Sequence, residues 1–268
     1  RLVDIGVGSV PGAARLLARP PFAAPAPDAH KYRRGLLGVV AGVMPGAALL
    51  AARAAQHAGA GYVKLLGEAP TAPADLVTDP APLASALADQ RFAALLVGPG
   101  LGRGSAARER LRAVLAAQKP CVIDADALVA LDPGDLAHHQ EPRILTPHGG
   151  EFDALERAFA LPGTGTKITR TAALAAATGA VVVFKGPDTV IADGEGRVCL
   201  ALRASSWLST AGTGDVLAGA IASRLATGLD AFSAAGQGVW LHGQAARLCG
   251  PAFTAGQLAE QMQTALAL

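Results

Sequence analysis

The sequence contains few aromatic residues and few charged ones. Aromatic side chains make up 4% of the 268 residues and charged side chains 16%, whereas 51% of the residues are hydrophobic. The interior is therefore built mainly from Ala, Leu and Val, a composition that suits close packing of helices on a sheet. The net charge is only +2, so there is no excess of positive charge that would indicate nucleic-acid binding.

Long apolar runs and cysteine pairs are also missing. The longest apolar candidate, residues 36–60, is interrupted by Gly38, Gly42, Pro45 and Gly46, so we expect no association with a membrane. The three cysteines, at positions 121, 199 and 249, are odd in number and far apart, which argues against a disulfide framework. They predict a reducing, cytoplasmic compartment. No two cysteines have the spacing of a metal site, and we predict no metal-ligating residues.

The chain divides into two parts by composition. Residues 1–27 include a proline-rich stretch and are predicted to be a linker, an extended arm or the remnant of a preceding domain. Residues 28–268 alternate between short apolar strands and amphipathic helices. The strands are expected at 36–41, 62–66, 94–97, 121–123, 143–145 and 181–184, with a hairpin over 189–192 and 197–201. The helices are expected at 45–57, 105–118, 151–159, 166–177, 214–227, 231–248 and 254–266.

This alternation predicts an α/β fold of three layers, with a mainly parallel central sheet between helices. The strands are continuous apolar runs, as expected where both faces of a parallel sheet are covered. Four of them are followed by unusual residues, at 98–102, 124–126, 146–151 and 185–186. Because ligands bind beyond the carboxyl ends of the strands in such sheets, these four segments predict one binding cleft.

Each of these strand ends also has a structural interpretation. The glycines of 98–102 form a tight turn or let a flat ligand approach the backbone. Asp124 and Asp126 cap the next helix, or act near phosphates through magnesium or water. His148 is a loop residue or a substrate contact. Lys185 ends an apolar strand, where an unpaired charge is costly, and a phosphate is its natural partner.

The segment 209–219 is the most informative one. Gly212, Thr213 and Gly214 lie where a loop turns into a helix, and the free N–H groups and dipole of a helix start bind anions such as phosphate. Asp215 follows directly. It is a helix cap, or it is a base that takes a proton from an attacking hydroxyl while the loop holds phosphate.

Taken together, these motifs resemble the ADP/ATP-dependent NAD(P)H-hydrate dehydratases, which have the ribokinase-like fold. The resemblance covers roughly residues 28–268. It is carried, in the order of the family, by His30-Lys31 with Arg34-Gly35, Pro45-Gly-Ala47-Ala, Ala58-Gly-Ala-Gly61, Gly98-Pro-Gly-Leu-Gly102, Asp124-Ala-Asp126-Ala-Leu128, Thr146-Pro-His148 with Glu151-Phe152, Lys185-Gly186 and Thr210-Ala-Gly-Thr-Gly-Asp215-Val-Leu-Ala-Gly219.

The resemblance implies repair of damaged nicotinamide nucleotides. Such enzymes dehydrate the S form of NAD(P)H hydrate, using ADP or ATP with Mg²⁺ to phosphorylate the 6-hydroxyl and then eliminating phosphate. It implies that Asp215 is the base and also contacts the substrate. It further implies substrate contacts from Ala47, Gly100, Gly102 and His148, and nucleotide contacts from Lys185, Gly186, Pro187, Asp188, Thr189, Gly212, Thr213 and Gly214.

The resemblance also implies a homo-oligomer, a tetramer in similar proteins, and a fusion to an epimerase domain whose last strand residues 1–6 resemble. Val43-Met44 and Ser205-Ser206 depart from the family pattern near the expected cleft. The alternative function is that of a small-molecule kinase of the same superfamily, for a vitamin precursor or a sugar. A catalytically inactive nucleotide-binding module is a third interpretation, against which the intact Asp215 argues. We interpret His242 as a packing or surface residue.

Overall fold

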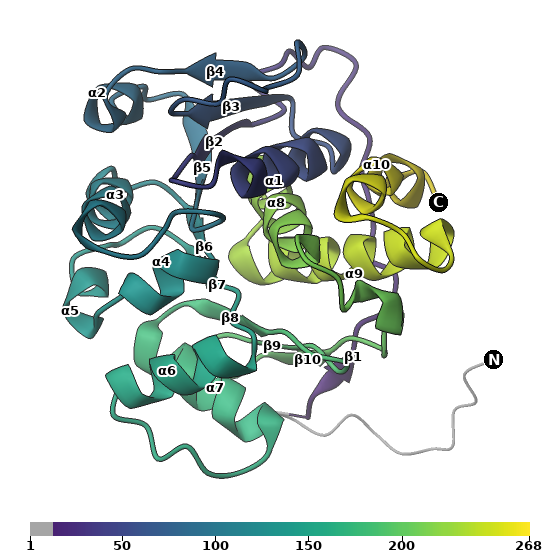
Figure 1. Cartoon of the computed structure of the whole chain (residues 1–268). Coiled ribbons are helices and arrows are strands. Elements are labelled where there is room, and N and C mark those ends of the chain that lie inside the picture. Colours follow the sequence, from purple (N-terminus) through teal and green to yellow (C-terminus); the bar gives the residue numbers. More distant parts are fainter. Residues whose placement is uncertain (1–12) are drawn as a thin grey trace.

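Ten strands form one sheet through the middle of residues 13–268, the part of the chain that the computed structural model describes (Figure 1). Their order across the sheet is β1-β10-β9-β8-β7-β6-β5-β2-β3-β4. The strands are β1 (Arg15–Leu16), β2 (Leu36–Val40), β3 (Tyr62–Leu66), β4 (Val77–Asp79), β5 (Phe92–Val97), β6 (Cys121–Ile123), β7 (Arg143–Leu145), β8 (Val181–Phe184), β9 (Val190–Ala192) and β10 (Val198–Leu200).

Strand pairing follows the predicted pattern. The neighbours from β4 to β8 are all parallel, as expected for strands connected by helices. The antiparallel pairs are β8 with β9 and β9 with β10, the latter forming the expected hairpin. The mainly parallel sheet is thus confirmed.

Helices cover both faces of the sheet, so the predicted three layers are confirmed (Figure 1). One layer contains α1 (Pro45–His57), α8 (Thr213–Ala226), α9 (Ala231–Cys249) and α10 (Ala255–Leu266). The other contains α2 (Leu83–Leu87), α3 (Ser105–Ala116), α4 (Ala125–Ala130), α5 (Pro133–Leu136), α6 (Gly149–Ala158) and α7 (Lys167–Thr178). A short 3₁₀ turn, η1 (Ser206–Leu208), precedes α8.

Small residues let the first helical layer pack closely. All five residues of β2 are buried, and the side of the sheet facing α1 and α8 is covered by alanines such as Ala51 and Ala218. A Cβ atom added to Gly219 would lie 2.1 Å from the carbonyl oxygen of Ala51, so the backbones of α8 and α1 meet without side chains between them. The close packing of helices that the composition predicted, with few aromatic residues and many alanines, is therefore present.

Several short elements were not predicted. The strand β4 and the helices α2, α4 and α5 comprise three to six residues each, too few to establish a hydrophobic period in the sequence. The strand β5 begins at Phe92, two residues before the predicted start. The predicted helices otherwise agree with the structure to within a few residues at each end, and α8 begins at Thr213.

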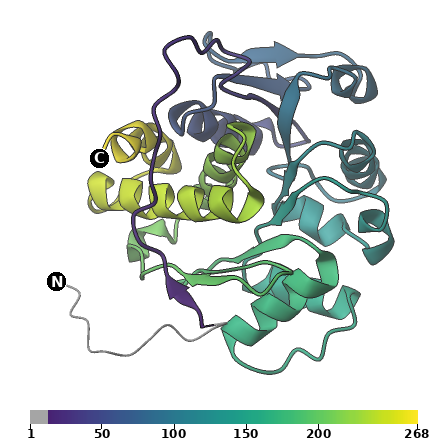
Figure 2. The same cartoon turned by 180° about the vertical axis from the view of Figure 1, so that it is seen from behind.

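Part of the predicted N-terminal arm belongs to the same sheet. The strand β1 pairs in parallel with β10, and the Leu17 N–H donates to the carbonyl of Leu200 at 2.7 Å. From there the arm crosses the α9 side of the molecule to β2 (Figure 2), with the Phe22 ring 5.4 Å from that of Trp240. The boundary after residue 27 stays a prediction, and residues 1–6, compared above with an epimerase strand, lie outside the described part.

Within residues 13–268 no helix combines the length and the apolar character needed to cross a bilayer.

Candidate active site

Buried polar residues gather where β6, β7 and β8 end. Asp124, directly after β6, is only 1% exposed, and one of its carboxylate oxygens, Oδ1, accepts hydrogen bonds from Thr146 Oγ1 and from Lys185 Nζ, both at 2.7 Å. Glu151 on α6 approaches the same ammonium group at 3.8 Å. The parallel registers of β6 with β7 and of β7 with β8 bring these side chains, which are up to 61 residues apart in sequence, to one edge of the sheet.

The charges in this cluster influence one another. Burial opposes the charged form of Lys185, but the carboxylates of Asp124 and Glu151 outweigh it and raise the pKa of the lysine above its ordinary value. Burial raises the pKa of Glu151, although Lys185 acts in the opposite direction. Lys185 is therefore an ammonium ion, held in one position by carboxylates. The sequence analysis expected a phosphate as the partner of Lys185 and did not reveal these two carboxylates.

Asp126, at the start of α4, forms a hydrogen bond with the glycine-rich segment 98–102 that follows β5. Its Oδ2 accepts the backbone N–H of Gly102 at 2.9 Å. The preceding residue, Ala125, has φ +47°, a left-handed conformation that costs a residue with a Cβ atom about 1 kcal/mol. This strained turn directs Asp124 and Asp126 to different partners, so neither carboxylate makes a side-chain cap of α4.

His148 caps the start of α6. Its Nδ1 accepts the backbone N–H groups of Gly150 and Glu151, at 3.1 and 3.4 Å, and its Nε2 lies 3.2 Å from Oε1 of Glu151. Both ring nitrogens thus have partners within the helix start, and the side chain is 61% exposed. A substrate would meet the exposed ring face rather than a free nitrogen.

Ala47, Gly100 and Gly102 lie together beside the loop that precedes α1. A Cβ atom on Gly100, whose φ is +64°, would lie 2.2 Å from the carbonyl oxygen of Met44 and 3.0 Å from Cβ of Ala47. A Cβ atom on Gly102 would lie 2.6 Å from the Val43 side chain. The departing pair Val43-Met44 is therefore part of this surface, with Val43 69% exposed.

Asp215 lies in the first turn of α8, as predicted. Gly212 precedes the helix with φ +88°, which suits glycine, and Asp215 is the third helical residue. Burial raises the pKa of the Asp215 carboxyl to about 7, with a further contribution from the negative charge of Asp124, while Lys185 opposes the shift. A carboxyl group with a pKa near neutrality is suited to act as a general base.

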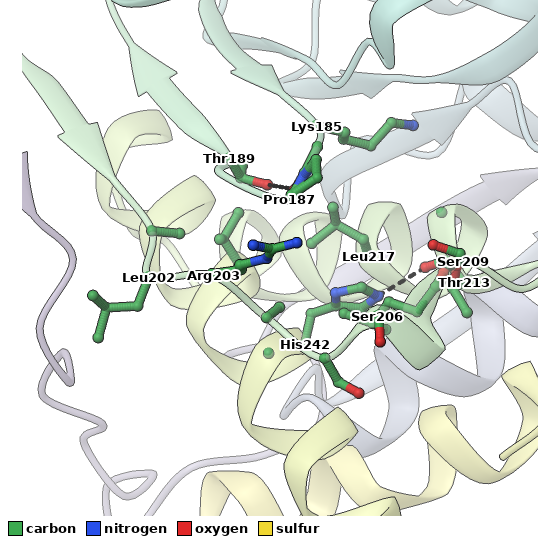
Figure 3. A pocket seen from close by; sticks show the side chains of 18 residues that line it. Lys185, Pro187, Thr189, Leu202, Arg203, Ser206, Ser209, Thr213, Leu217 and His242 are labelled. Carbon is green, nitrogen blue, oxygen red and sulfur yellow. Dashed lines mark hydrogen bonds between the residues drawn. The ribbon is translucent and has the colours of Figure 1, made fainter. Parts of the chain in front are cut away.

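A cavity of about 390 Å³ opens between the β8–β10 end of the sheet and the start of α8 (Figure 3). Six of the predicted nucleotide-binding residues line it: Lys185, Gly186, Pro187, Thr189, Thr213 and Gly214. Two others do not. Asp188 forms an ion pair with Lys167 at 3.1 Å, and Gly212 packs against Leu50 and Ala255.

The sequence analysis did not single out Arg203, and it gave His242 only a packing or surface position. Both line the cavity, and Figure 3 shows the Arg203 guanidinium directed into it. His242 is a partly buried residue of α9 whose Nε2 lies 2.9 Å from the Thr213 carbonyl, so Nε2 carries the hydrogen and Nδ1 is an acceptor. Burial lowers the pKa of His242 to about 4, which keeps the ring neutral. Because His242 lies on α9, far from the other cavity residues in sequence, no sequence pattern indicated that it would line the cavity.

Comparisons with known proteins identify the family of this chain. A family model described as NAD(P)H-hydrate dehydratase matches residues 37–267. The chain belongs to the NAD(P)H-hydrate dehydratase family. It is 39% identical over 241 residues to the ADP-dependent (S)-NAD(P)H-hydrate dehydratase of Neisseria meningitidis, covering 84% of this chain and 80% of that protein.

The bifunctional NAD(P)H-hydrate repair enzyme of Mycobacterium leprae is 38% identical over 258 residues, which are 91% of this chain and 54% of that enzyme. The chain thus spans about half the length of such bifunctional relatives. Among solved structures, the ADP/ATP-dependent NAD(P)H-hydrate dehydratase of Bacillus subtilis, co-crystallised with ATP and Mg²⁺, superimposes with a TM-score of 0.77 at 27% identity, over 91% of this chain and 93% of that one. The predicted ribokinase-like fold is confirmed.

Proposed function

We propose that this chain regenerates NAD(P)H from the S form of its hydrate in a reaction driven by ADP or ATP. The hydroxyl on C6 of the hydrated ring attacks the terminal phosphorus of the nucleotide, and its proton passes to Asp215. The terminal phosphoanhydride bond breaks, and AMP leaves from ADP or ADP from ATP. The C6–O bond then breaks with release of phosphate, and loss of a proton from C5 restores the ring double bond. The names of the relatives from Neisseria meningitidis and Bacillus subtilis support this assignment.

One observation carries the proposal: the carboxyl group of Asp215, with a pKa of about 7, lies in the first turn of α8, a helix start that we expect to bind phosphate. A base with this pKa is half ionised near neutral pH and still holds a proton well enough to draw it from an alcohol. A carboxylate that only caps a helix works best when it is ionised, and burial near the negative charge of Asp124 disfavours that ionised form. The same placement therefore favours proton transfer over capping.

The phosphoryl group would lie between the N–H groups of 212–214 and the ammonium of Lys185. A Cβ atom on Gly214 would lie 3.6 Å from Lys185 Nζ, so the open space at this glycine borders the positive charge. Phosphoryl transfer depends on positioning and on stabilising charge more than on covalent catalysis. Asp124 and Thr146 contribute by fixing the lysine rather than by touching the substrate.

The adenine nucleotide would occupy the cavity lined by Lys185, Gly186, Pro187, Thr189 and the segment before α8. The neutral His242 offers Nδ1 as an acceptor for an amino group, and Arg203 offers donors for phosphate oxygens. The hydrated dinucleotide would approach from the other side of Asp215, over Ala47, Gly100, Gly102 and the exposed face of His148.

Mg²⁺ would enter with the nucleotide. No group of three or more His, Cys, Asp or Glu side chains within residues 13–268 is arranged to hold a metal ion. The carboxylates present are engaged instead, Asp124 with Lys185 and Asp126 with Gly102. This donor set suits an ion that keeps several waters and binds through phosphate oxygens, where it neutralises phosphate charge.

The reaction is expected in the cytoplasm, where thiols remain reduced, and all three cysteines are free. The homo-oligomer and the fused epimerase domain stay predictions, and the bifunctional relatives support the second of these.

The deciding experiment mixes the purified protein with hydrated NADH and either ADP or ATP in the presence of Mg²⁺. We expect the near-ultraviolet absorbance of reduced nicotinamide to recover, with release of one phosphate per NADH formed. ADP or ATP alone, and substrate without nucleotide, are the controls. Consumption of nucleotide only when an unrelated vitamin precursor or sugar is supplied would instead identify a small-molecule kinase.

A further inference from the structure

A second cavity lies at the opposite end of α8 from Asp215. It has a volume of about 470 Å³ and lies between the N-terminal arm, which is purple in Figure 2, and the ends of α8 and α10. Its lining combines three arginines, Arg33, Arg34 and Arg224, with the apolar side chains of Phe22, Leu229 and Leu266. None of the proposed catalytic or nucleotide-binding residues borders it.

Arg224 is the unusual residue in this cavity. It is 7% exposed, yet no carboxylate within residues 13–268 forms an ion pair with it. Its Nε donates to Oε1 of Gln237 at 2.7 Å and its Nη1 to the Ala58 carbonyl at 3.1 Å. Both acceptors are neutral. Nη2 donates to no group in the described part of the chain, and it is not one of the fully buried atoms without a partner there, so it is open to the cavity or to solvent.

The surroundings keep this guanidinium in place. Gln237 is 5% exposed and is itself oriented by its donation to the Pro21 carbonyl at 2.9 Å. The Phe22 ring centroid lies 5.7 Å from Cζ of Arg224. The arm therefore closes one side of the cavity and places an aromatic ring beside a charge that has no counterion. Burial lowers the pKa of Arg224, because the surroundings solvate the charged guanidinium less well than water does.

Arg34 supplies a second positive group. Its Nη2 donates to the Gly59 carbonyl at 3.4 Å, and it too lacks a carboxylate partner in residues 13–268. Arg33 is paired with Asp28 at 2.9 Å and contributes less charge. Arg224 and Arg34 each donate one hydrogen bond to a carbonyl at the end of α1, to Ala58 and Gly59 respectively. A role in helix capping therefore leaves most of the donors in the cavity unused.

We propose that this cavity binds an organic phosphate, with the phosphate on Arg34 and Arg224 and a compact apolar body against Phe22, Leu229 and Leu266. Guanidinium groups bind phosphate oxygens through paired donors, and an anion here would compensate the buried charge of Arg224. The cavity is larger than inorganic phosphate requires. Its apolar side chains would also gain no favourable contact from a bare ion, whereas they can pack against an apolar group of the ligand. Arg34, which the catalytic rim leaves unexplained, belongs to this site.

The probe is phenyl phosphate, which has an aryl body but no nucleoside. We expect calorimetry to detect one site per chain whose affinity is unchanged by saturating ATP, because the nucleotide cavity lies at the other end of α8. Inorganic phosphate should bind about tenfold more weakly, since it lacks the apolar body. Displacement of phenyl phosphate by ATP, or equal affinity for inorganic phosphate, would overturn the assignment.

Variants at exposed positions locate the site without disturbing the core. Ala26 lines the cavity and is exposed, so Ala26→Glu places a carboxylate there and should weaken phenyl phosphate binding by about tenfold or more. Arg34→Gln should weaken it several-fold. Ala106→Glu adds the same charge to an exposed position on α3, behind the sheet, and should leave the affinity unchanged. Equal binding by Ala26→Glu and the native protein would exclude this cavity.

Discussion

Replacing Asp215 with asparagine should inactivate the enzyme and stabilise its fold at the same time. Asparagine keeps the shape of the side chain but cannot accept a proton. We expect the rate of NADH recovery to fall by about 10²- to 10⁴-fold, the usual contribution of a general base. Adenine-nucleotide binding should remain nearly unchanged, because Asp215 does not line the nucleotide cavity.

The gain in stability follows from the raised pKa. The Asp215 carboxyl has a pKa of about 7 in the folded chain against an ordinary value of 3.8, so its charged form destabilises the fold. The penalty is absent below pH 3.8, grows as the pH rises from there and is complete above about 7. The full shift corresponds to about 4 kcal/mol at most, and solvent screening of a half-buried group reduces this to about 1–2 kcal/mol. For a chain of this length, that raises Tm by about 2–8 °C.

The assay is thermal unfolding at about pH 8 and again at about pH 4, where the gain should vanish. Asp89→Asn is the matched control. A hydrogen bond from Arg91 lowers the pKa of Asp89 to about 2, so its ionised form stabilises the fold, and its loss should lower Tm at neutral pH. An Asp215→Asn protein that keeps its rate, or that loses stability at pH 8, would refute the reasoning.

Three further predictions concern the same site. The value of kcat/KM should rise about tenfold per pH unit below 7 and level off above it, as measured in a pH–rate profile, because the base form of Asp215 is the active one. Gly214→Ala should raise KM for the nucleotide with little change in Tm, since its Cβ atom meets Lys185 at an ordinary 3.6 Å, whereas Gly212→Ala should lower Tm because of its positive φ and its contacts. Lys185→Met should cost about 3–5 kcal/mol in denaturant unfolding by leaving Asp124 unpaired, and adding Asp124→Asn should recover part of that loss.

Much of the fold could be predicted because its signals are local. Apolar runs such as 181–184 are buried on both faces, and α8 begins within one residue of its predicted start at Gly214. The segments that follow the strands also marked the edge of the sheet where the site lies, since the carboxyl ends of parallel strands must meet there. Short elements such as α5 carry too few residues for any period to be visible.

The partners of each side chain could not be predicted in the same way. Nothing in the sequence around Lys185 indicates that Asp124 holds its ammonium group, or that His148 uses its nitrogens to cap α6. The role of His242 depends on α9 crossing beneath the first turn of α8. These contacts join residues tens of positions apart, so they exist only after the sheet and helices have assembled.

The sequence by itself determined the order of strands and helices along the chain, the glycine-rich helix start that we predict to bind an anion, and the carboxylate placed after it. These features depend on residues close together in the chain. The tertiary structure decided the chemistry of that carboxylate. Burial and the charge of Asp124, brought from 91 positions earlier in the chain, raise the pKa of Asp215 to about 7. Electrostatic interactions depend on distance in space and on exclusion of water, and neither can be read from the order of the residues.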